Sequence, residues 1–140
     1  ILDYAHTINA TENILNYANK IKKKRIITVV GCAGGREKEK RPTIGKIVTQ
    51  KSDYVIFTTD DPRYEKVTDI INDMTKEIEK ENYQIIINRK RAIKHAIEEA
   101  KEQDIVLILG KGIDNYMAIK NKYKKYCDKD VIEKILKKKK

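Results

Sequence analysis

Short apolar segments alternate with amphipathic segments along most of the chain, and this alternation restricts the fold more than any other feature. The apolar segments are rich in β-branched residues, which is typical of strands buried on both faces. The segments between them carry apolar residues at spacings of three and four, as helices packed on a sheet do. Strands that alternate with helices predict right-handed βαβ units. The sequence therefore predicts an α/β fold with a mostly parallel sheet covered on both faces.

The pattern also places the elements approximately. Strands are predicted at residues 1–2, 25–30, 54–58, 83–87 and 105–109. Helices are predicted at residues 9–23, from residue 43, at residues 66–80 and 92–100, and at the C-terminus from Asp128 or Asp130. Asn9, with Glu12 three residues later, would cap the first helix. Hydrophobic periodicity is weak from residue 113 to residue 130, and no element is predicted there.

The length of 140 residues fits one domain, predicted at residues 1–136, followed by a basic tail at residues 137–140. The chain has no initiator Met and begins in an apolar stretch, which suggests a domain excised from a longer protein. It contains no apolar run long enough to cross a bilayer and no signal-peptide pattern. Cys32 and Cys127 match no zinc or redox spacing. These features predict a cytoplasmic protein without membrane insertion.

Residues 54–63 end a buried strand in two carboxylates, a proline and a guanidinium. Pro62 fixes its own φ and keeps Asp61 out of helical conformations, so the charges of this loop are held in place. Arg63 can bind a carboxylate while Asp60 or Asp61 binds an ammonium, which predicts a zwitterionic small molecule. An ordinary β-turn that leads into a helix cap is the alternative interpretation.

Four unusual segments each follow a predicted strand, at residues 3–7, 31–41, 59–63 and 110–114. In an open parallel sheet, ligands bind beyond the carboxyl ends of the strands. The fold would therefore bring these segments to one edge of the sheet, although they lie far apart in sequence. We expect a common cleft formed by the neighbourhoods of His6, Arg36, Arg63 and Asp114.

The glycine-rich segments match no complete nucleotide-binding motif. Residues 31–35 are not G-x-G-x-x-G, and the sequence has no G-x-x-x-x-G-K-[ST] loop. A dinucleotide site and P-loop ATP hydrolysis are therefore not expected in these residues. Lys111, between two glycines, fits either a fragment of a phosphate cradle or a plain tight turn. Cys32 lacks an identifiable His partner and is interpreted as a small buried residue.

Four ordered motifs resemble the C-terminal domain of the Mur ligases, in particular the MurE type that adds the third stem-peptide residue to UDP-N-acetylmuramoyl-dipeptide. The motifs are Asp-Tyr-Ala-His-Thr at residues 3–7, Gly-Cys-Ala-Gly-Gly-Arg at 31–36, Thr-Asp-Asp-Pro-Arg at 59–63 and Gly-Lys-Gly at 110–112. The resemblance covers nearly the whole chain. It implies a Rossmann-like three-layer α/β/α domain that binds the incoming amino acid and closes over ATP held on a central domain.

The resemblance also implies which steps belong to which domain. ATP, with Mg²⁺, phosphorylates the carboxylate of UDP-MurNAc-L-Ala-D-Glu, and the amine of the amino acid attacks the acyl phosphate. The P-loop, the magnesium ligands and a carbamylated lysine belong to the central domain of the family. No catalytic residue and no metal ligand is therefore expected here, and the domain alone should be inactive. The whole enzyme would be a monomeric, cytoplasmic ligase of peptidoglycan synthesis, with roles in cell shape and cell division.

Carried over by position, the resemblance implies two groups of binding residues. The amino-acid substrate would contact Arg36, Asp60, Asp61, Pro62, Arg63, Gly110 and Asp114. The nucleotide would lie toward Asp3, Tyr4 and His6.

Three positions depart from the pattern of the diaminopimelate-adding enzymes. Asp61 replaces the Asn of Asp-Asn-Pro-Arg, and Ile113 and Asp114 replace the His-Glu that follows Gly-Lys-Gly. Arg63 favours a substrate with a distal carboxylate, such as meso-diaminopimelate or lanthionine, whereas the added charge of Asp61 favours lysine or ornithine. We predict diaminopimelate or such an analogue, because a buried guanidinium needs an anion.

The net charge of +10 suggests a different class of function. Residues 20–41 and residues 120–140 each carry a net charge of +7, and lysines alternate with Tyr116, Tyr123 and Tyr126. This composition is compatible with a basic α/β nucleic-acid-binding module. The basic residues are mostly Lys and no nucleic-acid-binding motif is present, so we predict no nucleic-acid partner. A purely structural interaction domain is a third alternative.

Overall fold

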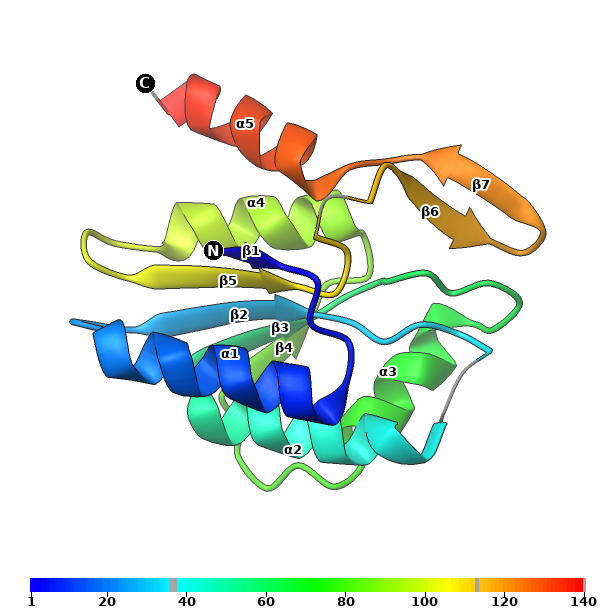
Figure 1. The fold of residues 1–140 in the computed structure, drawn as a ribbon, viewed down its shortest axis with the longest axis horizontal. Helices are drawn as coiled ribbons and strands as arrows, with labels where there is room; N and C mark the ends of the chain where they lie inside the picture. Colours follow the sequence, from blue (N-terminus) through cyan, green and yellow to red (C-terminus); the bar gives the residue numbers. More distant parts are fainter. Residues whose placement is uncertain (36–37, 113, 140) are drawn as a thin grey trace.

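The computed structural model describes residues 1–35, 38–112 and 114–139. Five strands form one sheet in the order β1-β5-β2-β3-β4 (Figure 1), and every neighbouring pair is parallel. The strands are β1 (Leu2–Asp3), β2 (Ile26–Val30), β3 (Tyr54–Phe57), β4 (Tyr83–Ile85) and β5 (Ile105–Leu109). Their carboxyl ends are level, since Val30 lies opposite Phe57 and Asp3 opposite Leu109.

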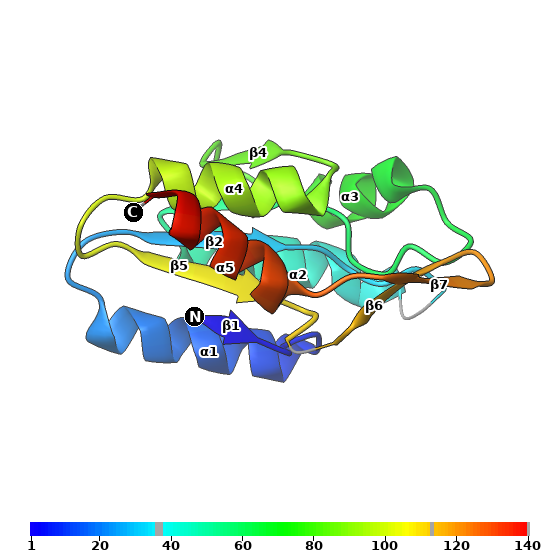
Figure 2. The same ribbon diagram turned by 90° about the horizontal axis from the view of Figure 1, so that it is seen from above.

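Helices cover both faces of the sheet, as the two views in Figures 1 and 2 show. One face carries α1 (Ile8–Ile21), α2 (Arg41–Lys51) and α3 (Val67–Thr75). The other face carries α4 (Arg89–Glu99) and α5 (Asp128–Lys139). A short 3-10 helix, η1 (Lys38–Lys40), precedes α2. The predicted three-layer α/β fold is therefore confirmed. No helix in the described part of the chain has the length and apolar character needed to cross a membrane.

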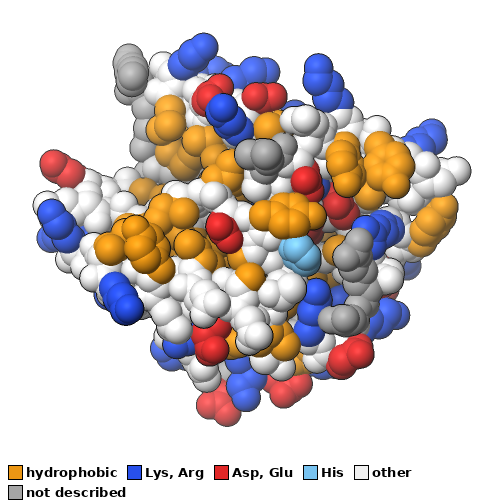
Figure 3. Space-filling model, in the orientation of Figure 1, with side chains coloured by type: hydrophobic (Ala, Val, Ile, Leu, Met, Phe, Trp, Pro, Cys, Tyr) orange, Lys and Arg blue, Asp and Glu red, His pale blue; other side chains and the backbone are white. Residues whose placement is uncertain are grey.

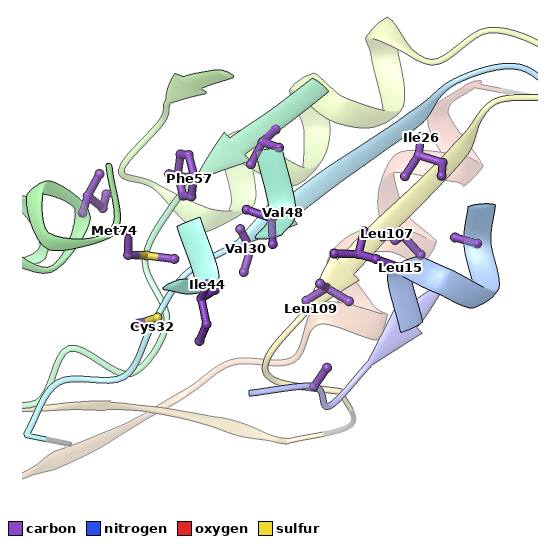
Figure 4. Packing of buried hydrophobic residues seen from close by; sticks show 14 of the residues in the cluster. Leu15, Ile26, Val30, Cys32, Ile44, Val48, Phe57, Met74, Leu107 and Leu109 are labelled. Atoms are coloured by element: carbon purple, nitrogen blue, oxygen red, sulfur yellow. The ribbon is translucent and has the colours of Figure 1, made fainter. Parts of the chain in front are cut away.

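The core consists of two layers because alternate strand residues point to opposite faces of the sheet. On one face, the strand residues Val30, Phe57 and Leu109 pack with Leu15 of α1 and Met74 of α3 (Figure 4). The other layer contains Val29, Ile56 and Ile108 with residues of α4 and α5. Continuous apolar strands are thus buried on both sides, as their sequence indicates.

The predicted cap of the first helix and the predicted end of the third helix were wrong. Thr7, rather than Asn9, caps α1, because its Oγ1 accepts the backbone N–H of Ala10 at 3.1 Å. Helix α3 ends at Thr75 instead of Lys80, although Ile78 still packs on the core from the turn that follows. A hairpin of β6 (Tyr116–Ile119) and β7 (Lys122–Lys125) lies where no element was predicted. Strand β7 is exposed throughout, so its sequence lacks the apolar alternation by which a strand is recognised. Residues 137–139, from the predicted tail, continue α5.

Gly45 allows α2 and α3 to pack unusually closely. A Cβ at this position would lie 1.8 Å from the carbonyl oxygen of Met74. Helix propensity alone predicts that Gly45→Ala stabilises α2 by about 1 kcal/mol. The close contact instead predicts that Gly45→Ala destabilises the domain, because the added methyl group forces the two helices apart. We expect a net loss of about 2 kcal/mol in the free energy of unfolding. Urea denaturation measures the change, and Thr43→Ala on the exposed side of the same helix is the control. A stabilised Gly45→Ala variant would contradict the close packing.

Candidate functional site

A cleft lies at the carboxyl edge of the sheet, where the segments that follow β1, β2, β3 and β5 meet. Its lining includes Tyr4, His6, Asp60, Asp61, Arg63, Gly110 and Asp114. Figure 3 shows acidic, basic and histidine side chains close together on the surface beside the segment that leaves β1. Three of the four expected neighbourhoods therefore share one cleft, while Arg36 lies outside the described residues.

The two other predicted site residues adjoin the cleft without lining it. The carbonyl oxygen of Asp3 accepts the backbone N–H of Gly110 at 3.0 Å, which joins the ends of β1 and β5. Pro62 is buried, and its carbonyl oxygen accepts the N–H of Glu65 at 3.0 Å. Both residues shape the loops from which their neighbours reach the cleft.

Arg63 is held in a backbone conformation that residues with side chains rarely adopt. Its φ is 51°, in the left-handed region. Its N–H donates to the carbonyl of Ala118 at 3.0 Å, and its carbonyl accepts the N–H of Lys120 at 2.6 Å. The half-buried guanidinium donates from Nη1 to the carbonyl of Gly34 at 3.1 Å. Strained residues of this kind cluster at functional sites, where the surrounding structure fixes the side chain.

Asp61 is already paired within the protein. Its Oδ1 accepts the ammonium of Lys111 at 2.7 Å and the backbone N–H of Ala118 at 3.0 Å. The side chain of Lys111 is fully buried, so this ion pair is shielded from water. The added negative charge of Asp61, relative to Asn, is therefore neutralised internally.

Lys111 forms part of a turn, as one of its two interpretations expected, because the N–H of Asp114 donates to its carbonyl at 2.9 Å. Its ion pair with Asp61 is not apparent from the local sequence pattern. The available signal was two carboxylates after β3 and a lysine after β5, because a parallel sheet brings the carboxyl ends of its strands to one edge.

Asp60 and Cys32 lie deeper in the cleft. Asp60 is almost fully buried, and its Oδ1 accepts the N–H of Asp61 at 2.7 Å. Burial raises the pKa of Asp60, while the charges of Arg89 and Lys111 oppose that rise. Burial, together with the charge of Asp60, raises the pKa of the Cys32 thiol to about 12. Cys32 packs among core residues in Figure 4, which confirms its interpretation as a small buried residue.

Two aromatic rings and a lysine form the N-terminal side of the cleft. The rings of Tyr4 and His6 meet edge to face with centroids 4.7 Å apart. The Nδ1 of His6 lies 2.9 Å from the carbonyl oxygen of Tyr4, which fixes the ring orientation. Lys40 donates to the carbonyl of His6 at 2.9 Å and also lines the cleft. Lys40 could not be singled out from the sequence, because it lies within a run of alternating charges.

A buried arginine joins the loop after β2 to the loop after β3. The N–H of Gly34 donates to the carbonyl of Asp61 at 2.7 Å, and a Cβ at position 34 would lie 1.9 Å from the carbonyl oxygen of Pro62. Arg41 donates to both carboxylate oxygens of Glu65, at 2.9 and 3.0 Å. Glu65 in turn accepts the N–H of Gly35 at 2.7 Å. These contacts fix the segment that leads directly to residue 36.

The Arg41–Glu65 pair predicts a dependence of stability on pH. The hydrogen bonds from Arg41 and from the Gly35 N–H lower the pKa of Glu65 from 4.5 to about 2. The resulting stabilisation is complete above about pH 4.5 and is lost as the pH falls toward 2. The stability difference between the wild type and Glu65→Gln, measured by urea denaturation, should therefore shrink as the pH is lowered from 6 to 3 (roughly the window set by this shift). Glu98→Gln, on the exposed side of α4, is the control, and a constant Glu65→Gln difference would contradict the assignment.

The described residues include no group of three or more His, Cys, Asp or Glu side chains placed to hold a metal ion.

Comparison with known proteins shows similarity to ligases. The chain is 43% identical over 137 residues to a UDP-N-acetylmuramoyl-L-alanyl-D-glutamate--2,6-diaminopimelate ligase of Clostridium botulinum, with 98% of this chain aligned. It is 45% identical over 137 residues to the ligase of the same name from Aquifex aeolicus, with 97% of this chain aligned. The chain spans 28% of the length of each of these two relatives.

A solved structure of a UDP-N-acetylmuramoyl-L-alanyl-D-glutamate--2,6-diaminopimelate ligase superposes on 99% of this chain, with a TM-score of 0.93 and 31% sequence identity. The match covers 29% of that longer chain. The family model described as "Mur ligase, glutamate ligase domain" matches residues 1–112. The chain therefore belongs to the Mur ligase family, and its fold is that of the family's glutamate ligase domain.

Proposed function

We propose that this chain is the C-terminal, amino-acid-binding domain of an ATP-dependent ligase that adds the third residue to UDP-MurNAc-L-Ala-D-Glu in peptidoglycan synthesis. The observation that carries the proposal is Arg63, held at a φ of 51° with its guanidinium at a cleft that also contains Asp60 and Asp114. A guanidinium beside carboxylates suits a substrate with both carboxylate and ammonium groups. The names of the relatives support the same reaction.

The substrate is meso-diaminopimelate or an analogue with a distal carboxylate, such as lanthionine. Arg63 and Arg36 bind its carboxylates, Asp60 and Asp114 bind ammonium groups, and Gly110 lets the substrate approach the backbone. The pairing of Asp61 with Lys111 at 2.7 Å supports this choice over lysine, because Asp61 then adds no free negative charge to the cleft. A diamino acid without the distal carboxylate would leave Arg63 without its anion.

ATP and Mg²⁺ are bound chiefly by parts of the ligase outside these residues. The sequence contains no P-loop, and the described residues offer no cluster of metal-ligating side chains. Asp3, Tyr4 and His6 lie toward the nucleotide when the domain closes. These residues alone are thus inactive, and the complete ligase acts as a cytoplasmic monomer. The alternative of a nucleic-acid-binding module receives no support from the relatives, and the rings of Tyr116 and Tyr123 pack against each other rather than forming separate stacking platforms.

The full-length ligase that contains this chain provides the test. With UDP-MurNAc-L-Ala-D-Glu and ATP, we expect ligation of meso-diaminopimelate or lanthionine with a higher kcat/KM than lysine, and no ligation by the 140 residues alone. Preferential use of lysine would overturn the substrate, and absence of any ligation would overturn the reaction. A titration with labelled RNA at increasing salt checks the alternative, because nucleic-acid binding weakens steeply with salt.

A further inference from the structure

A buried ion pair lies behind the cleft, on the face of the sheet covered by α4 and α5. Arg89, the first residue of α4, donates to both carboxylate oxygens of Asp128 at 2.7 and 2.9 Å. The two side chains are 1% and 0% exposed. The hydroxyl of Tyr126 also donates to Asp128. The pair therefore joins the start of α4 to the start of α5 without access to water.

The remaining hydrogen bonds of Arg89 go to two strand ends. Nη1 donates to the carbonyl of Thr59 at 3.1 Å, and Nη2 donates to the carbonyl of Leu109 at 3.0 Å. Thr59 directly precedes Asp60, and Leu109 directly precedes Gly110. Strands β3 and β5 are not neighbours, since β2 lies between them in the sheet. One planar guanidinium thus spans three strands at the edge where the cleft lies.

Stability alone gives little reason for such a pair. Removing two charges from water costs about as much as their attraction returns, and apolar residues of similar volume often serve stability equally well. A guanidinium offers something that apolar residues and lysine do not, which is several N–H donors in a rigid planar arrangement. Here the guanidinium binds the carbonyl groups of Thr59 and Leu109, and each of these residues directly precedes one of the two proposed substrate-binding loops.

We propose that Arg89, oriented by Asp128, is a positioning residue that fixes the spacing between the Asp60–Arg63 loop and the Gly110–Asp114 loop. This role rests on the proposed function, because those two loops are the ones assigned to the amino acid. Arg89 does not line the cleft, so it acts through the loops and not on the substrate.

The test compares Arg89→Lys with Arg25→Lys in the full-length ligase. Lysine keeps the charge next to Asp128, but its three donors sit on one nitrogen and cannot reproduce the four hydrogen bonds that Arg89 makes from three nitrogens. Arg25 is a matched control, since it pairs with Asp104 at 2.9 Å and donates to the carbonyl of Glu99 at 3.1 Å, at the opposite edge of the sheet. We expect Arg89→Lys to raise the KM for the amino acid about ten-fold, with the KM for ATP and for the UDP-dipeptide changed less than about two-fold. Arg25→Lys should change none of them.

Hydrogen–deuterium exchange provides a readout that does not depend on ligation. The amides of Arg63 and Ala118 join the Asp60–Arg63 loop to β6, through the carbonyl of Ala118 and the carboxylate of Asp61, and the amide of Gly110 donates to the carbonyl of Asp3. We expect all three to exchange at least about ten-fold faster in Arg89→Lys than in Arg25→Lys, while amides of α2 stay unchanged. If the wild type ligates no amino acid, the proposed function fails, but this exchange result still decides the role of Arg89.

Three outcomes would overturn the positioning role. They are unchanged exchange at the three amides, faster exchange throughout the domain, and a parallel rise in all three KM values. If Arg89→Lys does not fold, the apolar variant Arg89→Met/Tyr126→Phe/Asp128→Leu replaces it, because it leaves no buried charge without a partner. A folded apolar variant with wild-type exchange at these amides and wild-type KM for the amino acid would equally end the proposal.

Discussion

Replacement of Arg89 by Met is expected to lower the free energy of unfolding by about 3 to 5 kcal/mol, the largest loss among the single substitutions considered for this chain. The carboxylate of Asp128 would stay buried without a counter-ion, since its side chain is 0% exposed. The carbonyls of Thr59 and Leu109 would lose donors at the same time. Because small domains are stable by only about 5 to 15 kcal/mol, this loss would remove a large share of the total stability.

Urea denaturation monitored by circular dichroism measures this loss. Arg25→Met is the matched control, because it also removes an arginine from an aspartate. The Arg25 side chain is 45% exposed, and Asp104 keeps the backbone N–H groups of Arg25 and Lys101 as donors. We expect a much smaller change for Arg25→Met. If the two variants lost the same free energy of unfolding, burial of the Arg89–Asp128 pair would not explain its contribution to stability.

Arg63→Ala in the full-length ligase is expected to raise the KM for meso-diaminopimelate by about 10- to 100-fold, the effect of removing one hydrogen-bonded charge from a buried carboxylate. Use of lysine should become no worse, because lysine has no distal carboxylate. The measurement is the steady-state KM of each amino acid at saturating ATP and UDP-dipeptide. Unchanged kinetics with diaminopimelate would contradict the role of Arg63.

Two further variants separate loss of charge from loss of structure. Arg63→Lys keeps the positive charge but not the planar donor arrangement, so its KM should lie between those of the wild type and Arg63→Ala. Arg91→Ala removes an exposed arginine of α4 that does not line the cleft and should leave the KM unchanged. Thermal unfolding of all three variants tests whether Arg63 also maintains the contact of its backbone with β6.

The sheet could be predicted from the sequence because its longer strands are almost entirely apolar and rich in β-branched residues. Segments such as Ile26–Val30 and Ile105–Leu109 are compatible only with burial on both faces, and the helices between them fix the parallel direction. The hairpin of β6 and β7 could not be predicted in this way. Its contacts include the bridge from Ile119 to Arg63 and an edge-to-face pair of Tyr116 and Tyr123 between its own two strands, and neither contact leaves a periodic pattern in the sequence.

The location of the cleft could also be predicted, since it follows from the direction of the strands. The ion pairs within the cleft could not be predicted. Asp61 looks like a free carboxylate in sequence, but a lysine 50 positions later neutralises it. Likewise, Arg41, Arg89 and Asp128 resemble surface charges on amphipathic helices, yet all three are buried. Long-range partners of this kind depend on loop geometry, which a local pattern does not encode.

The two-residue strand β1 lies at the margin of the sheet, and within the described parts of the chain it pairs with β5 alone, more than 100 positions later. Contacts between such distant residues form late in folding, because a very long stretch of chain must first be closed. The rings of Tyr4 and His6 can therefore reach their places only after the central strands have assembled. A nascent or partly refolded molecule would have its apolar interior in place while one wall of the cleft was still absent, so competence to bind a ligand should lag behind compaction in a refolding time course.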